Sequence, residues 1–458
     1  MTPLPTIEHV ILLMFENRSF DNMLGAFYPA TQDGGGVPSG WSNPWPGNPD
    51  VDAWQAQPGG AAQTIPYPDP NELYANMSVQ INGDGYGPIR GFVIDYATVA
   101  NASPPNIMQY YSAENVPVTS ALAMAYAASD RYFASGPVQT WPNRLFSLCG
   151  TPGYDPGTNL AYLNNTEYPE YPFIDGQLNW PTIFEQLDNA AASWKVYFED
   201  EVPICAILNY VWENWDWLEC GGNVFPFEND PLDCGKTFFD EVINNTLPAF
   251  SLIEPRYQMY SFDGDVAPTS NHPGSSSPID NSGVPINISC GEQMLAKVFQ
   301  ALSANSTLFE KTLLIVTYDE HGGLFDHVFP PPAVSPFQAG TVTNFNYDVY
   351  GVRVPALFIN PYVKPGLFQP PPAMAFDHTS ILATLRDQFG LSGSLSPRVD
   401  QAPTFAGLVD TSLQPITAPS ITLPQCVWSP PSVDGAHAEP ILRSALSRAR
   451  LGRRRRRG

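Results

Sequence analysis

Four short runs of β-forming residues constrain the fold of this 458-residue chain more than any other feature. Each run is continuously apolar instead of alternating between apolar and polar residues. The runs are HVILLMF (9–15), PAFSLIE (248–254), TLLIVTY (312–318) and VPALFIN (354–360). Such runs are typical of strands that are buried on both faces, as in a parallel sheet covered by helices.

Segments with helical periodicity lie between and after these runs. They are WPTIFEQLDNAAASW, CGEQMLAKVFQALSAN and HTSILATLRDQFG. Because strands and helices alternate along the chain, we expect an α/β fold with a doubly wound, mainly parallel sheet flanked by helices.

The length allows two or three domains, or one large domain with insertions. Residues 28–90 and 200–235 lack clear periodicity and are rich in Gly, Pro, Asn, Asp and Trp, so we interpret them as loop-rich insertions in a main domain of residues 1–400. Residues 401–440 are rich in Pro, Ser and Thr, which is typical of an extended segment or a linker. Residues 441–458 carry an arginine run without acids, and we expect this tail to be disordered.

The charge balance excludes some partners. The chain has 21 basic and 45 acidic residues, and many of its arginines lie in the last segment. An acidic body of this kind repels the backbone of nucleic acids, so no nucleic-acid partner is expected. The longest apolar runs are also far too short to span a bilayer, so no transmembrane segment is expected.

Cysteines and sequons favour the secretory pathway. Six cysteines without a CxxC pair allow up to three disulfides, with Cys205, Cys220 and Cys234 close enough for local loops. N-x-[ST] sequons occur at several positions, among them Asn17 and Asn76. We therefore expect a glycoprotein that is secreted or lies in the secretory-pathway lumen, although no signal peptide is visible at the start of this chain.

Polar residues follow the first and third apolar runs directly. Glu16 and Asn17 follow the first run, and Asp319, Glu320 and His321 follow the third. Ligands of open α/β sheets bind outside the carboxyl ends of the strands, and adjacent carboxylates repel one another unless a cation or a proton lies between them. We therefore expect a divalent metal ion here, with Ca, Mg, Mn and Fe all possible, although solvated acids at strand ends are the alternative.

Histidines in loops are candidates for proton transfer. His272 lies in the loop SNHPG, and His321 and His327 flank GGLFD, whose glycines permit a tight turn. His378 precedes a helix and could instead be a cap residue. Asp326 and His327 could support the metal site or make purely structural contacts.

A hydroxyl at a helix start is the best candidate for a nucleophile. No GxSxG motif occurs, which argues against an α/β-hydrolase. In SGPVQTWPNRLFSLCGT, Thr140 stands at the start of a helix, with Asn143 and Arg144 one turn later. Thr140 is either a helix cap or lies where free N–H groups and the helix dipole favour a phosphate. Arg144 could bind phosphate or pair with one of the many acids.

Several segments resemble, in one order from residue 7 to about 392, the phosphoesterase family. This family contains bacterial phosphatidylcholine-type phospholipases C and related acid phosphatases within the alkaline-phosphatase-like superfamily. The blocks ENRSFD and YDEHGGLFDH are the most specific. The segments are ILLMFENRSFDNMLG, TWPNRLFSLCGT, SLIEPRY, SNHPG, TLLIVTYDEHGGLFDHVFPPP, GVRVPALFINPYV and FDHTSILATLRDQFGL.

The resemblance implies roles for individual residues. Thr140 would be the nucleophile that forms a phosphothreonine intermediate, and His272 or His321 would transfer protons. Asn143 and Arg144 would lie at the substrate. A catalytic metal would be bound by four oxygen ligands, Glu16, Asn17, Asp319 and Glu320.

The expected function is metal-dependent hydrolysis of phosphoric esters, either diesters of the phospholipase C type or monoesters of the acid-phosphatase type. Relatives often carry further phosphate-site histidines in the first half of the chain, whereas His9 is the only histidine here before His272. A catalytically degenerate member that binds phosphorylated ligands or a wall component is therefore the alternative. The segment ILNYVWENWDWLEC (207–220) could form an aromatic cage for a choline-like cation or pack in the core.

Overall fold

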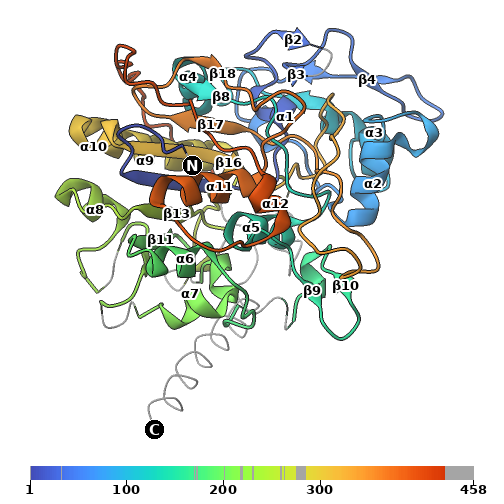
Figure 1. Ribbon diagram of the computed structural model, residues 1–458. Coiled ribbons are helices and arrows are strands. Elements are labelled where there is room, and N and C mark those ends of the chain that lie inside the picture. The colour runs from blue at the N-terminus through green and yellow to red at the C-terminus, as the bar shows by residue number, and fades with distance from the viewer. Residues whose placement is uncertain are drawn as a thin grey trace.

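A large sheet with helices on both faces forms the centre of the molecule (Figure 1). The arginine run predicted to form a tail lies outside the described part of the chain. The computed structural model describes residues 2–31, 34–169, 171, 174–200, 202–216, 220–229, 232–257, 260–261, 264–274 and 285–428.

The central sheet has eight strands in the order β12-β11-β13-β1-β16-β17-β8-β18. All their pairings are parallel except the two that β17 makes with β16 and β8. In sheet order the strands span Val224–Pro226, Trp194–Phe198, Phe250–Glu254, His9–Phe15, Thr312–Tyr318, Ala356–Ile359, Ala127–Ala128 and Gly366–Leu367.

The α/β class with a mainly parallel sheet is confirmed. The four apolar runs form β1, β13, β16 and β17, and all residues of β13, β16 and β17 are buried. The antiparallel direction of β17 differs from the expectation for its continuous apolar run. A strand that is buried on both faces needs the same composition in either direction, so composition alone does not reveal the direction.

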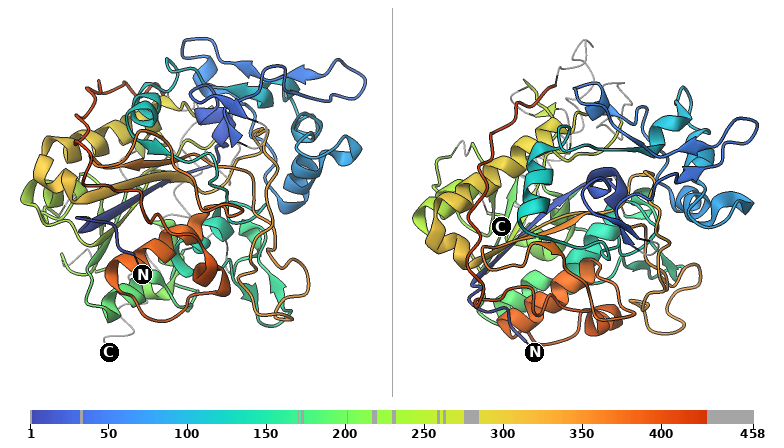
Figure 2. Two further views of the ribbon diagram at one scale, coloured as in Figure 1. Left: turned by 45° about the horizontal axis from the view of Figure 1, so that its top comes forward. Right: turned by 90° about the horizontal axis from the view of Figure 1, so that it is seen from above.

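Two layers of helices enclose the sheet (Figure 2). The layer with α4 and α9 covers one face, and the layer with α5 and α11 covers the other. In chain order, α1 to α12 span Phe20–Leu24, Tyr74–Asn82, Phe92–Tyr96, Pro117–Ala125, Thr140–Cys149, Ile183–Asn189, Asn209–Glu213, Phe238–Asn244, Ser289–Ala304, Ser306–Glu310, His378–Phe389 and Pro397–Gln401.

Short elements occupy the loops. Five small two-stranded ribbons pair β2 (Ala30–Thr31) with β3 (Gly34–Gly35), β4 (Ser42–Asn43) with β5 (Val51–Asp52), β6 (Trp54–Gln55) with β7 (Gln109–Tyr110), β9 (Tyr154–Asp155) with β10 (Leu160–Ala161), and β14 (Tyr260–Ser261) with β15 (Gly264–Asp265). The 3-10 helices η1 to η5 span Ala62–Thr64, Gly83–Gly85, Pro104–Met108, Asn165–Glu167 and Ile204–Ile207.

The two segments without periodicity differ in how they join the body. Residues 28–90 include α2, which packs with α3 against Leu324 and Phe325 in a small hydrophobic cluster of its own. Residues 200–235 include β12, which pairs with β11 at the edge of the central sheet. The second segment is therefore partly a piece of the sheet.

The end of the described chain is attached to α9. A disulfide joins Cys290 to Cys426, and Gln293 donates a hydrogen bond to the carbonyl oxygen of Pro424 at 2.9 Å. A second disulfide joins Cys220 to Cys234, whereas Cys149 and Cys205 are buried free thiols. The six cysteines thus form two disulfides and not three. Among the described helices, none has the length and apolar character needed to cross a membrane.

Candidate active site

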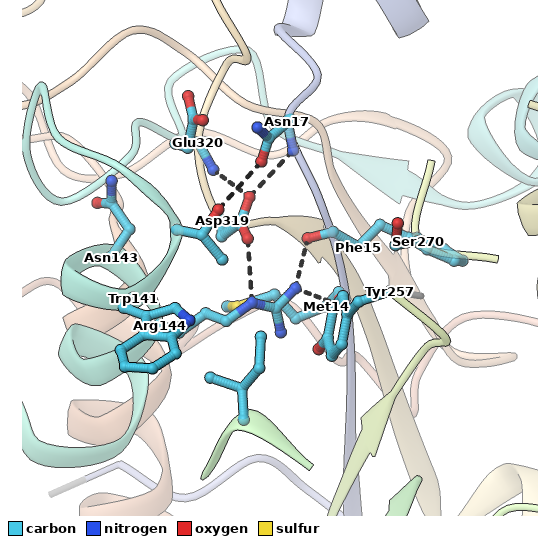
Figure 3. A network of polar contacts seen from close by, with 12 residues as sticks. Met14, Phe15, Asn17, Trp141, Asn143, Arg144, Tyr257, Ser270, Asp319 and Glu320 are labelled. Atoms are coloured by element: carbon cyan, nitrogen blue, oxygen red, sulfur yellow. Dashed lines mark hydrogen bonds and ion pairs between the residues drawn. The ribbon is translucent and has the colours of Figure 1, made fainter. Parts of the chain in front are cut away.

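The pairing register of β1 and β16 brings the two predicted acidic segments together. The strands pair in parallel over their whole length, and the last pair is Phe15 opposite Tyr318. The chain therefore leaves the sheet at the same level after both strands. The backbone N–H of Asn17 donates to Asp319 Oδ1 at 3.0 Å, and the N–H of Glu320 donates to the same oxygen at 2.7 Å (Figure 3).

Asn17 stands at the centre of this edge. Its backbone has a positive φ of 59°, a conformation that asparagine tolerates better than most residues. Its amide nitrogen Nδ2 donates to Glu72 Oε1 at 2.6 Å, and its amide oxygen accepts a hydrogen bond from Thr140 Oγ1 at 3.3 Å. Asn17 is fully buried, so the sequon at this position is not an accessible glycosylation site.

Thr140 is the first residue of α5, and the turn before it is fixed by Asn143. The side chain of Asn143 accepts from Gly136 N at 3.1 Å and donates to Val138 O at 2.7 Å. Trp141 N is bound by Asn165 Oδ1 at 2.8 Å. These hydrogen bonds fix the backbone on both sides of Thr140, and its hydroxyl lies close to the end of β1.

Arg144 reaches back from α5 to the same edge. Its Nε donates to Asp319 Oδ2 at 3.0 Å, and one terminal nitrogen donates to the carbonyl oxygens of Met14 and Phe15, each at 3.1 Å (Figure 3). The guanidinium also lies over the ring of Tyr257, 4.9 Å from its centre. Of the two interpretations left open by the sequence, these contacts favour the ion pair, and a contact of Arg144 with substrate stays a prediction.

His272 faces two acids from a different part of the chain, Asp69 and Glu72. His272 Nδ1 donates to Pro273 O at 2.6 Å and lies 3.6 Å from Asp69 Oδ1, while its Nε2 lies 3.5 Å from Glu72 Oε1. Burial acts to lower the pKa of His272, but the charges of Asp69 and Glu72 prevail and raise it well above its usual value. The histidine is therefore held in its charged form.

The acids of the site outnumber the basic side chains that contact them. Burial raises the pKa of Glu16 to about 7, with a further contribution from the charge of Asp319. Burial, followed by the charges of Glu72 and Asp319, raises the pKa of Glu320 well above its usual value. We call the residues of this site the acid-rich group: Glu16, Asp69, Glu72, Asp319 and Glu320 with His272.

The donor set fits a divalent cation. Within the described residues, Glu320 Oε1 and Asp69 Oδ1 are buried and accept no hydrogen bond. A buried carboxylate oxygen without a donor is costly, and a bound cation removes that cost. Carboxylate and amide oxygens are the ligands that hard divalent cations prefer. Among the described residues of this site, Asp69, Glu72 and His272 place possible ligand atoms within 4.8 Å of one another, and binding of an ion by Glu16, Asn17, Asp319 and Glu320 stays a prediction.

Two further histidines support the backbone and side chains of the site. His378 Nε2 donates to the carbonyl oxygen of Asp319 at 2.7 Å, and burial lowers the pKa of His378 to about 4. His321 Nε2 donates to Gln80 Oε1 at 2.7 Å, and its Nδ1 lies 3.4 Å from Glu320 Oε2. Burial lowers the pKa of His321 to about 3, so this ring is neutral. A proton-transfer role for His321 stays a prediction.

A second group of acids and a histidine lies nearby and has its own cation. Arg353 donates to Asp326 Oδ1 at 2.8 Å and to Asp21 Oδ1 at 2.9 Å, and Asp21 Oδ2 accepts from His327 Nδ1 at 2.7 Å. We call Asp21, Asp326, His327 and Arg353 the arginine-balanced group. Its contacts favour the structural interpretation of Asp326 and His327.

Sequence reasoning did not find Asp69 and Glu72. They lie in a Pro-rich loop without periodicity, and only the clustering of two acids near PDP could have drawn attention to them.

The aromatic segment before Cys220 packs in the protein and does not form an open cage where it is described. Trp215 contacts Phe198 and Trp212, with ring centroids 5.6 and 5.5 Å away. Residues 217–219 of that segment lie outside the described residues.

Comparison with known proteins identifies the class. A model of the Phosphoesterase family matches residues 7–392, and the chain belongs to this family of enzymes that hydrolyse phosphoric esters.

Individual relatives and solved structures are similar over most of the chain. This chain is 30% identical over 440 residues to Non-specific phospholipase C3 of Arabidopsis thaliana, and the match covers 92% of this chain and 76% of that protein. It is 28% identical over 429 residues to Phospholipase C A of Mycobacterium tuberculosis, covering 85% and 74%. A protein in the alkaline phosphatase superfamily from Vibrio parahaemolyticus covers 87% of this chain and 72% of its own, at 10% identity and a TM-score of 0.39.

Proposed function

We propose that this chain hydrolyses phosphodiesters of phospholipids with the help of a divalent cation, through a phosphothreonine intermediate. The observation that carries the proposal is the line of contacts from the Thr140 hydroxyl to the Asn17 amide oxygen and from the Asn17 N–H to Asp319. It joins a helix start and two strand ends that are far apart in the sequence.

The cation has one function in this proposal. Held by Glu16, Asn17, Asp319 and Glu320, it would lower the pKa of the Thr140 hydroxyl and offset charge on the phosphoryl oxygens. The unpartnered oxygen of Glu320 supports this assignment. Arg144 orients Asp319 by the ion pair at 3.0 Å, and its charge acts against burial, which raises the pKa of Asp319.

The residues of the chain carry out the covalent steps. Thr140 Oγ forms a bond to phosphorus while the bond from phosphorus to the alcohol oxygen breaks on the opposite side. The leaving alcohol takes a proton from His272, the proton that Thr140 loses passes to solvent, and His272 regains a proton from solvent at the end of the cycle. Water then breaks the threonine–phosphorus bond, releases the phosphorylated head group and restores the hydroxyl.

The substrate class rests on the relatives, which are named phospholipases C. A monoester substrate of the acid-phosphatase type is the second possibility carried over from the family resemblance. The two disulfides support folding in an oxidising compartment, so we propose that the protein is secreted.

Turnover of p-nitrophenyl phosphorylcholine and p-nitrophenyl phosphate, with and without EDTA, tests the proposal. We expect faster release from the diester and loss of release with EDTA. Thr140→Ala should lower kcat about a thousandfold or more, because the nucleophile is removed. Thr140→Ser keeps the hydroxyl and should remain active, and acid-quenched wild-type enzyme should carry phosphate on Thr140. Absence of release from both substrates with every divalent cation would instead favour a binding protein.

A further inference from the structure

Glu72 touches two parts of the candidate site although it belongs to none of the motif segments. Its Oε1 accepts a hydrogen bond from Asn17 Nδ2 at 2.6 Å and lies 3.5 Å from His272 Nε2. The side chain of Glu72 is 10% exposed, so these contacts lie inside the molecule.

The loop that carries Glu72 is clamped between two glycines. A Cβ atom at Gly323 would lie 2.8 Å from Pro70 Cβ, and one at Gly274 would lie 2.4 Å from Asp69 Cα. Both glycines have a positive φ, 68° and 76°. Only glycine tolerates both a positive φ and such close contacts. Packing of Asp69 and Pro70 against Gly274 and Gly323 therefore fixes the loop that carries Glu72.

A carboxylate at this position determines which way the Asn17 amide faces. An ionised carboxylate only accepts hydrogen bonds, whereas an amide donates from its nitrogen and accepts at its oxygen. The amide nitrogen of Asn17 must therefore face Glu72, and its oxygen must face Thr140, as the contacts at 2.6 and 3.3 Å show.

We propose that Glu72 is a positioning residue that sets the orientation of the Asn17 amide and so presents its oxygen to Thr140 and to the cation. The inference rests on the proposed function, because the amide oxygen matters there as a cation ligand. Glu72 itself touches neither Thr140 nor the reacting phosphoryl group in this scheme.

Binding of Mn²⁺ as a probe to the metal-free full chain tests the inference without turnover. Glu72→Met removes the acceptor, and we expect the Kd for Mn²⁺ to rise about 10- to 100-fold, the range for residues that orient a ligand from behind. Glu72→Gln loses the charge but keeps an acceptor oxygen, so it should retain most of the affinity. The same order is expected for kcat on p-nitrophenyl phosphorylcholine, with little change in KM.

A double-mutant cycle with Asn17→Asp tests the orientation of the amide, and Glu72→Gln in the same background measures the part of the coupling that comes from the repulsion between two facing carboxylates. A carboxylate at position 17 offers an oxygen in either orientation, so Glu72→Met should weaken Mn²⁺ binding at least tenfold less in this background. Asp69→Asn is the matched control, because it removes one charge from the same loop without contacting Asn17, and it should be additive with Asn17→Asp.

The outcomes are distinct. If Glu72→Gln loses as much affinity as Glu72→Met, or if the Glu72 cycle is additive, Glu72 acts through charge or loop structure and the inference fails, while the proposed function stands. If wild-type protein binds no Mn²⁺ and EDTA leaves turnover unchanged, the proposed function fails as well.

Discussion

The acid-rich group and the arginine-balanced group contain the same kinds of side chains and solve the same electrostatic problem in opposite ways. In each, two acids and a histidine place their possible ligand atoms within 4.8 Å of one another, Asp69, Glu72 and His272 in one and Asp21, Asp326 and His327 in the other. In the arginine-balanced group both acids contact the buried guanidinium of Arg353, whereas in the acid-rich group the guanidinium of Arg144 contacts Asp319 alone.

The difference shows how a structural cluster is told from a binding site. In the arginine-balanced group, Arg353 supplies the positive charge, and Asp326 also accepts from Val328 N at 2.8 Å. In the acid-rich group, two buried carboxylate oxygens have no donor among the described residues. In the arginine-balanced group one guanidinium balances two acids, whereas in the acid-rich group Arg144 and His272 face five acids, so this group is suited to take up a cation from solution.

The strongest test of the comparison is removal of the built-in cation. Arg353→Met leaves Asp21 and Asp326 without the buried guanidinium that balances their charge, and we expect the free energy of unfolding to fall by about 3–5 kcal/mol. Urea denaturation measures this change. Arg90→Met is the control, because the Arg90–Asp50 pair is partly exposed and 3.8 Å long, and should cost below about 1 kcal/mol. Equal losses in the two variants would contradict the comparison.

Addition of a cation should act on the acid-rich group alone. Mn²⁺ at a hundred times its Kd should raise the free energy of unfolding of metal-free protein by about 2.7 kcal/mol, since the ion binds only the folded state. Urea denaturation in EDTA and in Mn²⁺ gives the increment. Arg353→Met should show the same increment over its own metal-free state. An increment that disappears in this variant would mean that the two groups are not independent.

Removal of one negative charge should have opposite signs in the two groups. In EDTA at pH 8, Glu320→Gln should raise the free energy of unfolding by about 1 kcal/mol, because the folded state disfavours the ionised carboxyl. Asp326→Asn should lower it by about 2 kcal/mol, because at pH 8 it removes the ionised partner of Arg353; burial raises the pKa of Asp326 to about 6, which limits this loss. A destabilising Glu320→Gln would show that the acid-rich group is already balanced without metal.

The smallest expected effect is the pH dependence of His327. Burial acts to lower its pKa, but the hydrogen bond and charge of Asp21 prevail and raise it. The stabilisation from protonated His327 is therefore complete below its unfolded pKa of about 6.5 and is lost as the pH rises through the folded value. The stability difference between wild type and His327→Gln should shrink between pH 6 and pH 9, by about 1.4 kcal/mol per pKa unit of the shift. A difference that grows with pH would refute the assignment.

The predictions from sequence are most accurate for the strands with the strongest apolar character. β1 and β16 have the bounds of their apolar runs, because burial on both faces leaves no polar position inside them. β11, WKVYF, was missed because Lys195 interrupts it and the run is short. The pairing of Cys290 with Cys426 could not be inferred, since 136 positions separate them and only the packing of the extended segment on α9 brings them together.

The candidate site was predicted where the chain reaches it from the ends of regular elements. The strand-end rule placed Asn17 and Asp319 at one edge, and the parallel register of β1 and β16 brings them into contact. Asp69 and Glu72 reach the site from a loop whose course depends on close packing against Gly274 and Gly323. Such contacts between loops leave no periodic signal in the sequence.

The backbone and side chain of Asn17 together leave this position almost no choice of residue. The left-handed turn admits glycine, asparagine and aspartate readily, but glycine offers no oxygen and aspartate would face Glu72 with a second negative charge. A library of all twenty residues at this codon, selected for turnover, should therefore return asparagine nearly alone.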